Sequence, residues 1–410
     1  GVRQVSETVK DELAERFNQG NLWLLLDGLD EMQASSPVGA LTYIEQEVRS
    51  GYLQKARVVL TCRVNVWDAN LSNSLREFET YKTLDFAEGQ RDDFIRQWFT
   101  KKGNLALGEG LIAKLKESGR ERICELVKNP LRLVLLCYIW TQQAGELPET
   151  KAQFYQRYLS YFYEWKKEVR DLTQDDELQE SLHQALAKLA LAGIESDSRY
   201  RLPRKLARQK MGKELFKLAV DLGWLNIVDR EQGTDEAVYA FFHPTFQEFF
   251  AACGVEDWDF FLPRDHVDSP RLGKVYRIFE AKWKEVILLW LGRGDVKNEE
   301  KEAFIKALVE FEDNCKNFYF YRAFYLAAAG ISEFKHCSFA DEIVNLIIRW
   351  GFGYWNRETE KWTTFLTSIA ESAKKILPET DRSRAIAVLI YVIQITKDKS
   401  IRDQALESLR

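Results

Sequence analysis

The chain has 410 residues, enough for about three domains of ordinary size. Hydrophobic residues make up 46% and charged residues 30% of the chain, a composition that excludes an intrinsically disordered protein. The net charge of −5 argues against a dominant nucleic-acid surface, and the apolar runs are too short to predict a membrane span.

The first predicted elements are a helix and a short strand. Val5–Phe17 has apolar residues every four positions, which indicates an amphipathic helix. In the following segment, NLWLLLDGLDEM, the apolar run Leu22–Leu26 is too short for a core helix and lies between two glycines. We therefore predict a buried strand.

Three acids, Asp27, Asp30 and Glu31, follow this strand. Acids at the end of a buried strand are costly unless they bind something, and ligands of open α/β sheets bind at the carboxyl edge of the strands. One carboxylate would hold a magnesium ion on a nucleoside triphosphate, and another would polarise the attacking water. The alternative is a strand that ends in an acidic turn, since Asp-Gly is a common turn dipeptide.

A second strand is predicted at Arg57–Arg63 (RVVLTCR), after a helix at Pro37–Ser50. Strand, helix and strand at this spacing indicate a βαβ unit. Arg63 would then lie on the same edge as Asp27 and contact a γ-phosphate, the alternative being a surface arginine at the end of a strand. Tyr81–Phe86 is predicted as a third, shorter strand.

Helices dominate the remaining sequence. A helix over Leu131–Trp140 follows the break at Asn129, with Pro130 in its first turn. The helix Gln153–Lys167 carries an aromatic stripe, which we attribute to core packing rather than to a cofactor site. The members of this stripe are Phe154, Tyr158, Tyr161 and Trp165.

Helices at Leu178–Ile194 and Leu206–Leu222 precede a predicted β-hairpin, Trp224–Arg230 with Ala237–His243, which together outline a winged helix. Winged helices often bind DNA, but no cluster of Lys and Arg marks a reading face here. His243 lies at the corner where the strand passes into a helix. There it would contact a phosphate or, as the alternative, a backbone carbonyl.

Trp283–Arg410 is predicted to be helical throughout, with weak repeats that indicate the start of an α-solenoid of the HEAT type. The aromatic-glycine segment Trp350–Trp355 is interpreted as a loop that either binds protein or fills a gap between helices. The six cysteines form no C-x-x-C pair, so we expect buried free thiols and a cytoplasmic protein. The four histidines are scattered, so no zinc site is expected.

Four motifs, in this order and spacing, resemble the NACHT family of STAND signalling ATPases, in particular bacterial members with helical repeats. They are LWLLLDGLDEM, VVLTCR, KNPLRLVLLC and FFHPTFQEFFAA. The resemblance implies a predominantly α fold with a partial α/β nucleotide-binding domain. It divides the chain into the remainder of a P-loop NTPase domain (1–87), a helical domain (88–170), a winged helix (171–255) and HEAT-like helices (256–410).

The resemblance also implies ATP or ADP and Mg²⁺ as cofactors, and a role for each candidate residue. Asp27 would be the Walker B carboxylate on magnesium, and Asp30 and Glu31 would activate water. Arg63 would sense the γ-phosphate, Pro130 would pack against adenine, and His243 would touch the β-phosphate of ADP.

One feature departs from the family pattern, because no G-x-x-x-x-G-K-[ST] motif occurs. Only 26 residues precede Asp27, too few for the P-loop strand, loop and helix. We therefore expect the carboxy-terminal part of a larger protein, a slow regulatory ATPase as a whole. Alone, this part should bind ATP weakly or not at all, and micromolar binding by calorimetry would contradict this.

The resemblance implies a nucleotide-dependent switch in bacterial antiviral defence, triggered by a protein or phage-derived ligand on the helical tail and forming a homo-oligomer when active. The alternatives are a continuously working AAA-type motor, a helical scaffold without nucleotide turnover, and a winged-helix DNA binder.

Overall fold

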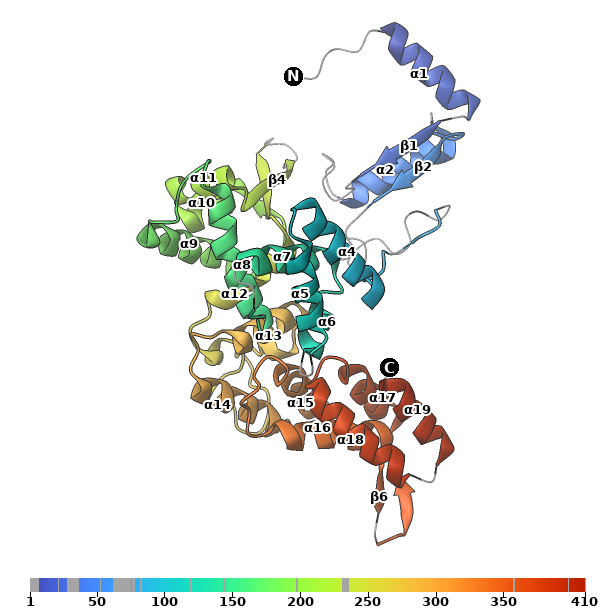
Figure 1. Ribbon diagram of the computed structural model, residues 1–410, viewed down its shortest axis with the longest axis vertical. Coiled ribbons are helices and arrows are strands. Elements are labelled where there is room, and N and C mark those ends of the chain that lie inside the picture. Colours follow the sequence, from blue (N-terminus) through green and yellow to red (C-terminus); the bar gives the residue numbers. More distant parts are fainter. Residues whose placement is uncertain are drawn as a thin grey trace. The chain divides into compact units, whose positions relative to one another are not determined.

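The computed structural model describes most of the chain (Figure 1). The described residues are predominantly helical, as predicted, and form three small sheets. The described residues are 7–20, 22–27, 37–51, 53–61, 75, 78–81, 83–117, 120–142, 145–196, 198–230, 236–356, 358–396 and 398–409. They fall into two compact units. Unit 1 comprises Gly1–Leu84 with Ser196–Pro244, and unit 2 comprises Asp85–Glu195 with Thr245–Arg410. No described helix has the length and apolar content needed to cross a bilayer.

The amino-terminal part of unit 1 contains two parallel strands. Its elements are α1 (Glu7–Gln19), β1 (Trp23–Leu26), α2 (Pro37–Ser50) and β2 (Arg57–Leu60). β1 pairs with β2 in parallel, with Leu26 opposite Leu60, which confirms the predicted strand-helix-strand order. Exposure alternates along both strands, and Trp23 and Leu25 are 59% and 71% exposed. The prediction of a buried strand is therefore wrong, since one face of β1 is exposed and the other, with Leu24 and Leu26, is only half-buried.

The predicted third strand, Tyr81–Phe86, is wrong for the residues that the structure describes there. Tyr81 and Leu84 are largely exposed and pair with no strand. The backbone N–H of Phe86 instead donates a 2.8 Å hydrogen bond to the carbonyl of Lys128, and its ring lies 5.9 Å from that of Phe94. Phe86 therefore packs beside the residues that follow it in the chain, Phe94 and Lys128, and does not pair in a sheet.

The second part of unit 1 is a three-stranded antiparallel sheet with two helices. These elements are β3 (Leu202–Pro203), α10 (Arg204–Met211), α11 (Lys213–Leu222), β4 (Leu225–Arg230) and β5 (Ala237–Phe241). β4 and β5 confirm the predicted hairpin, whereas β3, which pairs with β5, was not predicted. The single helix predicted over 206–222 is wrong, since Gly212, with φ +76°, separates α10 from α11.

Unit 2 begins with helices that share an aromatic core. They are α4 (Glu88–Lys101), α5 (Leu105–Leu115), α6 (Glu121–Leu126), α7 (Pro130–Gln142), α8 (Lys151–Lys166) and α9 (Asp176–Glu195), joined by α12 (Pro244–Cys253). Tyr155 and Tyr158 of α8 lie 5.3 and 5.4 Å from the ring of Phe246 in α12. This confirms the aromatic stripe as core packing, except that Trp165 is 55% exposed.

The tail of unit 2 consists mainly of stacked helices. They are α13 (Lys284–Gly292), α14 (Asn298–Val309), α15 (Phe318–Gly330), α16 (Ala340–Phe352), α17 (Thr367–Ile376), α18 (Arg382–Ile395) and α19 (Lys399–Leu409), preceded by short 3-10 turns at Trp258–Phe260, Arg277–Phe279 and Ala281–Trp283. The prediction of helix throughout is wrong at the antiparallel hairpin of β6 (Tyr354–Asn356) and β7 (Lys361–Thr363). The loop predicted at Trp350–Trp355 is also wrong, since this segment forms the last turn of α16 and the start of β6. Gly353, with φ +84°, ends α16 and allows the chain to turn into this hairpin.

Unit 2 contains the helices of both the predicted helical domain and the predicted HEAT-like region. The finer boundaries at 87, 170 and 255 stay predictions. Five cysteines are described, all as free thiols. Cys137 and Cys337 are buried as expected, but Cys315 is exposed, while Cys62 lies outside the described residues.

Candidate functional site

Asp27 lies at the carboxyl edge of the β1–β2 sheet, as predicted, and contacts Thr61. Because the strands are parallel and Leu26 is opposite Leu60, the next residues of both strands leave the sheet side by side. The Thr61 backbone N–H donates a 2.9 Å hydrogen bond to the carbonyl of Leu26. The Thr61 hydroxyl donates to Oδ1 of Asp27. This places a carboxylate and a hydroxyl together at the edge where α/β sheets bind ligands.

The donor set at this edge fits a magnesium ion. Asp27 and Thr61 are both exposed and offer only oxygen atoms, the ligands that Mg²⁺ prefers. Since Oδ1 of Asp27 accepts from Thr61, Oδ2 remains available to a metal or to a metal-bound water. A hydrogen bond of this kind fixes the orientation of a ligating carboxylate.

Sequence reasoning did not single out Thr61. The signal was present, because Thr61 follows RVVL as Asp27 follows WLLL. Its importance depends on the register of the two strands, which the sequence does not state. Asp30, Glu31 and Arg63, the other candidates near this edge, lie outside the described residues, so their roles stay predictions.

Pro130 begins α7, which confirms the predicted helix break. The side chain of Asn129 accepts a 3.3 Å hydrogen bond from the backbone N–H of Arg132 and so caps the helix. Pro130 fits the first helical position because it has no N–H to satisfy. Its ring is exposed and offers a rigid apolar surface.

His243 lies between β5 and α12, at the predicted strand-to-helix corner. The backbone N–H of Phe242 donates a 2.8 Å hydrogen bond to the carbonyl of Trp224, which extends the hairpin to the residue before His243. Pro244 then begins α12. His243 is half-buried, so part of its side chain is accessible.

The candidate residues are divided between the two units. Asp27 and His243 belong to unit 1, whereas Pro130 belongs to unit 2. That they meet around one nucleotide stays a prediction.

In a comparison with protein families, the NACHT domain matches residues 4–102 of the chain. The matched region includes β1, β2, Asp27 and Thr61, and it ends directly after α4. Pro130 and His243 lie beyond it. No curated protein matches the chain.

Proposed function

Because residues 4–102 belong to the NACHT family of nucleotide-binding signalling NTPases, we propose that the whole protein is an ATP- and ADP-dependent switch of the STAND type. The observation that carries the proposal is the pairing of Asp27 with Thr61 at the carboxyl edge of two parallel strands inside the matched region. A hydroxyl that orients the carboxylate is typical of a ligating carboxylate and so favours a metal site over an acidic turn.

In this proposal Thr61 orients the Asp27 carboxylate through Oδ1, and Oδ2 would hold the metal ion or a water bound to it. The Mg²⁺ ion, when bound, neutralises phosphate charge. Asp30 and Glu31 orient and polarise the attacking water, and Arg63 pairs with the γ-phosphate.

Two further residues give the nucleotide contacts outside the matched region. Pro130 packs its exposed ring against adenine. His243 donates to the β-phosphate of ADP, which links the hairpin of unit 1 to the state of the nucleotide.

The switch rests with ADP bound, and slow hydrolysis of ATP resets it. A protein ligand on the helical tail favours exchange for ATP and assembly into a homo-oligomer. The family resemblance supports a role for this switch in bacterial antiviral defence, in the cytoplasm and with a phage-derived trigger.

The test is the nucleotide content of the whole protein, measured by chromatography after denaturation. Wild-type protein should release bound ADP or ATP, Asp27→Asn should release much less, and the matched control Asp11→Asn on the exposed face of α1 should behave as wild type. Unchanged nucleotide content in Asp27→Asn would favour a helical scaffold. A high steady ATP turnover without a trigger would favour a motor.

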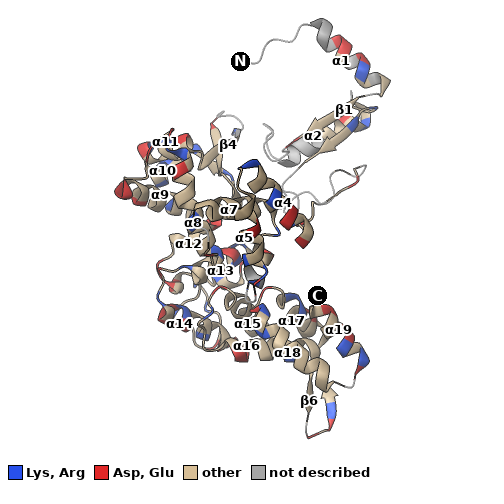
Figure 2. Ribbon diagram, in the orientation of Figure 1, with Lys and Arg blue, Asp and Glu red and all other residues tan. Residues whose placement is uncertain are grey.

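DNA binding is the remaining alternative for the hairpin and its helices. α10 carries basic residues and no acidic one, namely Arg204, Lys205, Arg208 and Lys210, whereas α11 carries both signs of charge (Figure 2). The acids of α11, Glu214 and Asp221, lower the positive charge of this part of unit 1 and favour a solvated surface over a phosphate-binding one. A mobility shift with duplex DNA at low salt would overturn that choice.

A further inference from the structure

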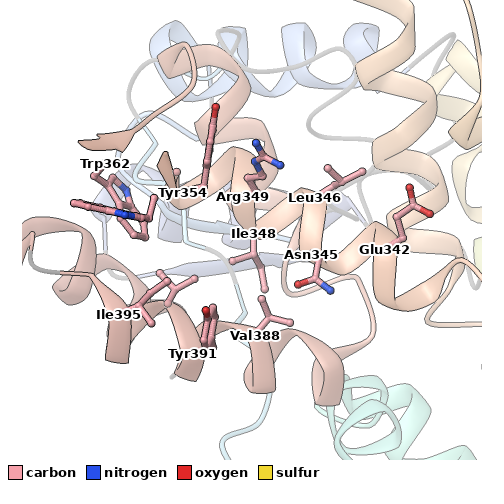
Figure 3. Close-up of a pocket in the computed structure, with 13 residues that line it drawn as sticks. Glu342, Asn345, Leu346, Ile348, Arg349, Tyr354, Trp362, Val388, Tyr391 and Ile395 are labelled. Atoms are coloured by element: carbon pink, nitrogen blue, oxygen red, sulfur yellow. The ribbon is translucent and has the colours of Figure 1, made fainter. Parts of the chain in front are cut away.

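A groove of about 690 Å³ lies in the tail of unit 2, between α16, α18 and the β6–β7 hairpin (Figure 3). We call it the tail groove. Its volume is in the range of ligand-binding pockets. The residues used below that line it are Glu342, Asn345, Arg349, Tyr354, Trp355 and Tyr391.

The hairpin end of the tail groove is fixed by close packing. Nε1 of Trp362 donates a 2.8 Å hydrogen bond to the carbonyl of Phe352 at the end of α16. Trp355 is directly opposite Trp362 in the hairpin. The groove is therefore formed before any ligand arrives, which lowers the cost of binding.

The wall from α18 is apolar and exposed. Tyr391 of α18 is 59% exposed, and Trp355 of the β6–β7 hairpin, which also lines the groove, is 46% exposed. After its first turn α18 carries no charged residue (Figure 2). Exposed apolar side chains gathered at one concave place mark an interaction site.

Arg349 supplies a positioned positive charge on the opposite wall. Its guanidinium carbon lies 3.7 Å from the centre of the Tyr354 ring, and Figure 3 shows the two side chains together on one side of the groove. Stacking engages the face of the guanidinium and leaves its in-plane N–H groups for a carboxylate. Within the described part of the chain, Arg349 forms no ion pair.

The other end of the tail groove is polar. Glu342 and Asn345 lie on the same side of α16 as Arg349, and Glu342 precedes Arg349 by two helical turns, a rise of about 10 Å. A ligand that reaches from Arg349 to Glu342 is longer than a single amino acid. This length favours a peptide segment laid along the two helices.

We propose that the tail groove binds a peptide segment of a partner protein in which bulky apolar side chains accompany a carboxylate. The carboxylate pairs with Arg349, and the apolar side chains pack on Tyr391 and Trp355. That the trigger binds at this groove rests on the proposed function. Binding of a peptide is measured in the absence of nucleotide, so its result does not depend on the test of the proposed function.

The experiment uses fluorescence anisotropy with three labelled peptides of about 12 residues, enough to span more than two helical turns. All three carry Leu and Phe at helical spacing, with Glu, Lys or Ser at the other positions. The 410-residue chain should bind the acidic peptide with a Kd on the order of ten micromolar and the other two at least about tenfold more weakly.

Arg349→Glu should weaken binding of the acidic peptide by at least about tenfold. The matched control Lys375→Glu, with the same change of charge on the exposed side of α17, should leave it within about twofold. Tyr391→Ser removes only an exposed side chain, so it should fold and still weaken binding by about fivefold or more.

Three results would overturn the proposal. They are no binding of the acidic peptide, equal binding of all three peptides, and self-association of the chain that Arg349→Glu abolishes, which would make a second copy the occupant. None of these three results bears on the nucleotide content of the whole protein, which tests the proposed function. Conversely, if Asp27→Asn left the nucleotide content unchanged, the peptide could still bind the tail groove.

Discussion

The carboxylate of Glu333 accepts a 2.8 Å hydrogen bond from the backbone N–H of Lys151, across 182 positions of the sequence. Beside it, the Lys151 ammonium group pairs with Glu285 at 2.8 Å, and the Thr150 hydroxyl donates to the carbonyl of Gly292 at 2.7 Å. The start of α8 is thus bonded to both α13 and the segment after α15. These contacts make the helices that follow the NACHT match continuous with the tail.

Glu333→Ala should lower the free energy of unfolding of unit 2 by about 1–3 kcal/mol. Glu333 is 1% exposed, and its removal leaves the N–H of Lys151 without its acceptor. Urea unfolding followed by circular dichroism measures the change. Glu371→Ala, at an exposed position of α17, is the control and should unfold as wild type does. Equal midpoints for both variants would show that the bond contributes nothing.

Asp313 should make stability depend on pH. Burial raises the pKa of its carboxyl, but hydrogen bonds from the backbone N–H groups of Cys315, Phe320, Tyr319 and Asn317 outweigh this, so the pKa lies below its ordinary value of 3.8. These bonds hold the loop before α15, where Lys316 and Asn317 have positive φ.

A lowered pKa means that the folded state binds the proton less readily than the unfolded state. The contribution of Asp313 is therefore complete above pH 3.8 and is lost as the pH falls through the pKa of the folded state. Urea unfolding at several pH values from neutral to below this range should show a steeper loss of stability for wild type than for Asp313→Asn. Parallel curves would rule out this role.

Gly353→Ala should destabilise the β6–β7 hairpin by about 1–2 kcal/mol, because φ is +84° and an added Cβ would lie 2.6 Å from Nε1 of Trp362 and clash with the carbonyl of Thr363. The melting temperature followed by tryptophan fluorescence reports the change. Gly294→Ala is the matched control, since a Cβ there meets no atom within 4 Å. Similar melting of the two variants would contradict the argument.

Thr61→Val should weaken magnesium-dependent nucleotide binding by the whole protein about tenfold to a hundredfold, because the Asp27 carboxylate loses the hydroxyl that orients it. Thr61→Ser keeps the hydroxyl and should bind nearly as wild type does. A magnesium titration of nucleotide binding measures both. If valine and serine gave the same affinity, the hydroxyl would have no role.

The position of Asp27 was predictable because it depends on local pattern alone. A short apolar run between glycines indicates a strand, and its last residue marks the ligand-binding edge. Pro130 and His243 were placed correctly for the same reason, since proline marks the start of each following helix.

The errors arose where distant residues decide the structure. Thr61 becomes a neighbour of Asp27 only through the register of β1 and β2. Tyr81–Phe86 has a strand-like pattern, but Phe86 finds its partner at Lys128 instead. The β6–β7 hairpin depends on the pairing of Trp355 with Trp362, which helical periodicity around it conceals.

The chain passes between the two units at three places, and one of these passages lies directly after His243, between Pro244 and Thr245. The proline ring fixes the φ of Pro244 at about −65°, which suits the first position of α12. On the far side, Phe246 and Phe250 of α12 are fully buried. Pro244 is therefore both the last residue of unit 1 and the first residue of a helix whose aromatic side chains are buried in unit 2, so a substitution at Pro244 would act on the folding of both units.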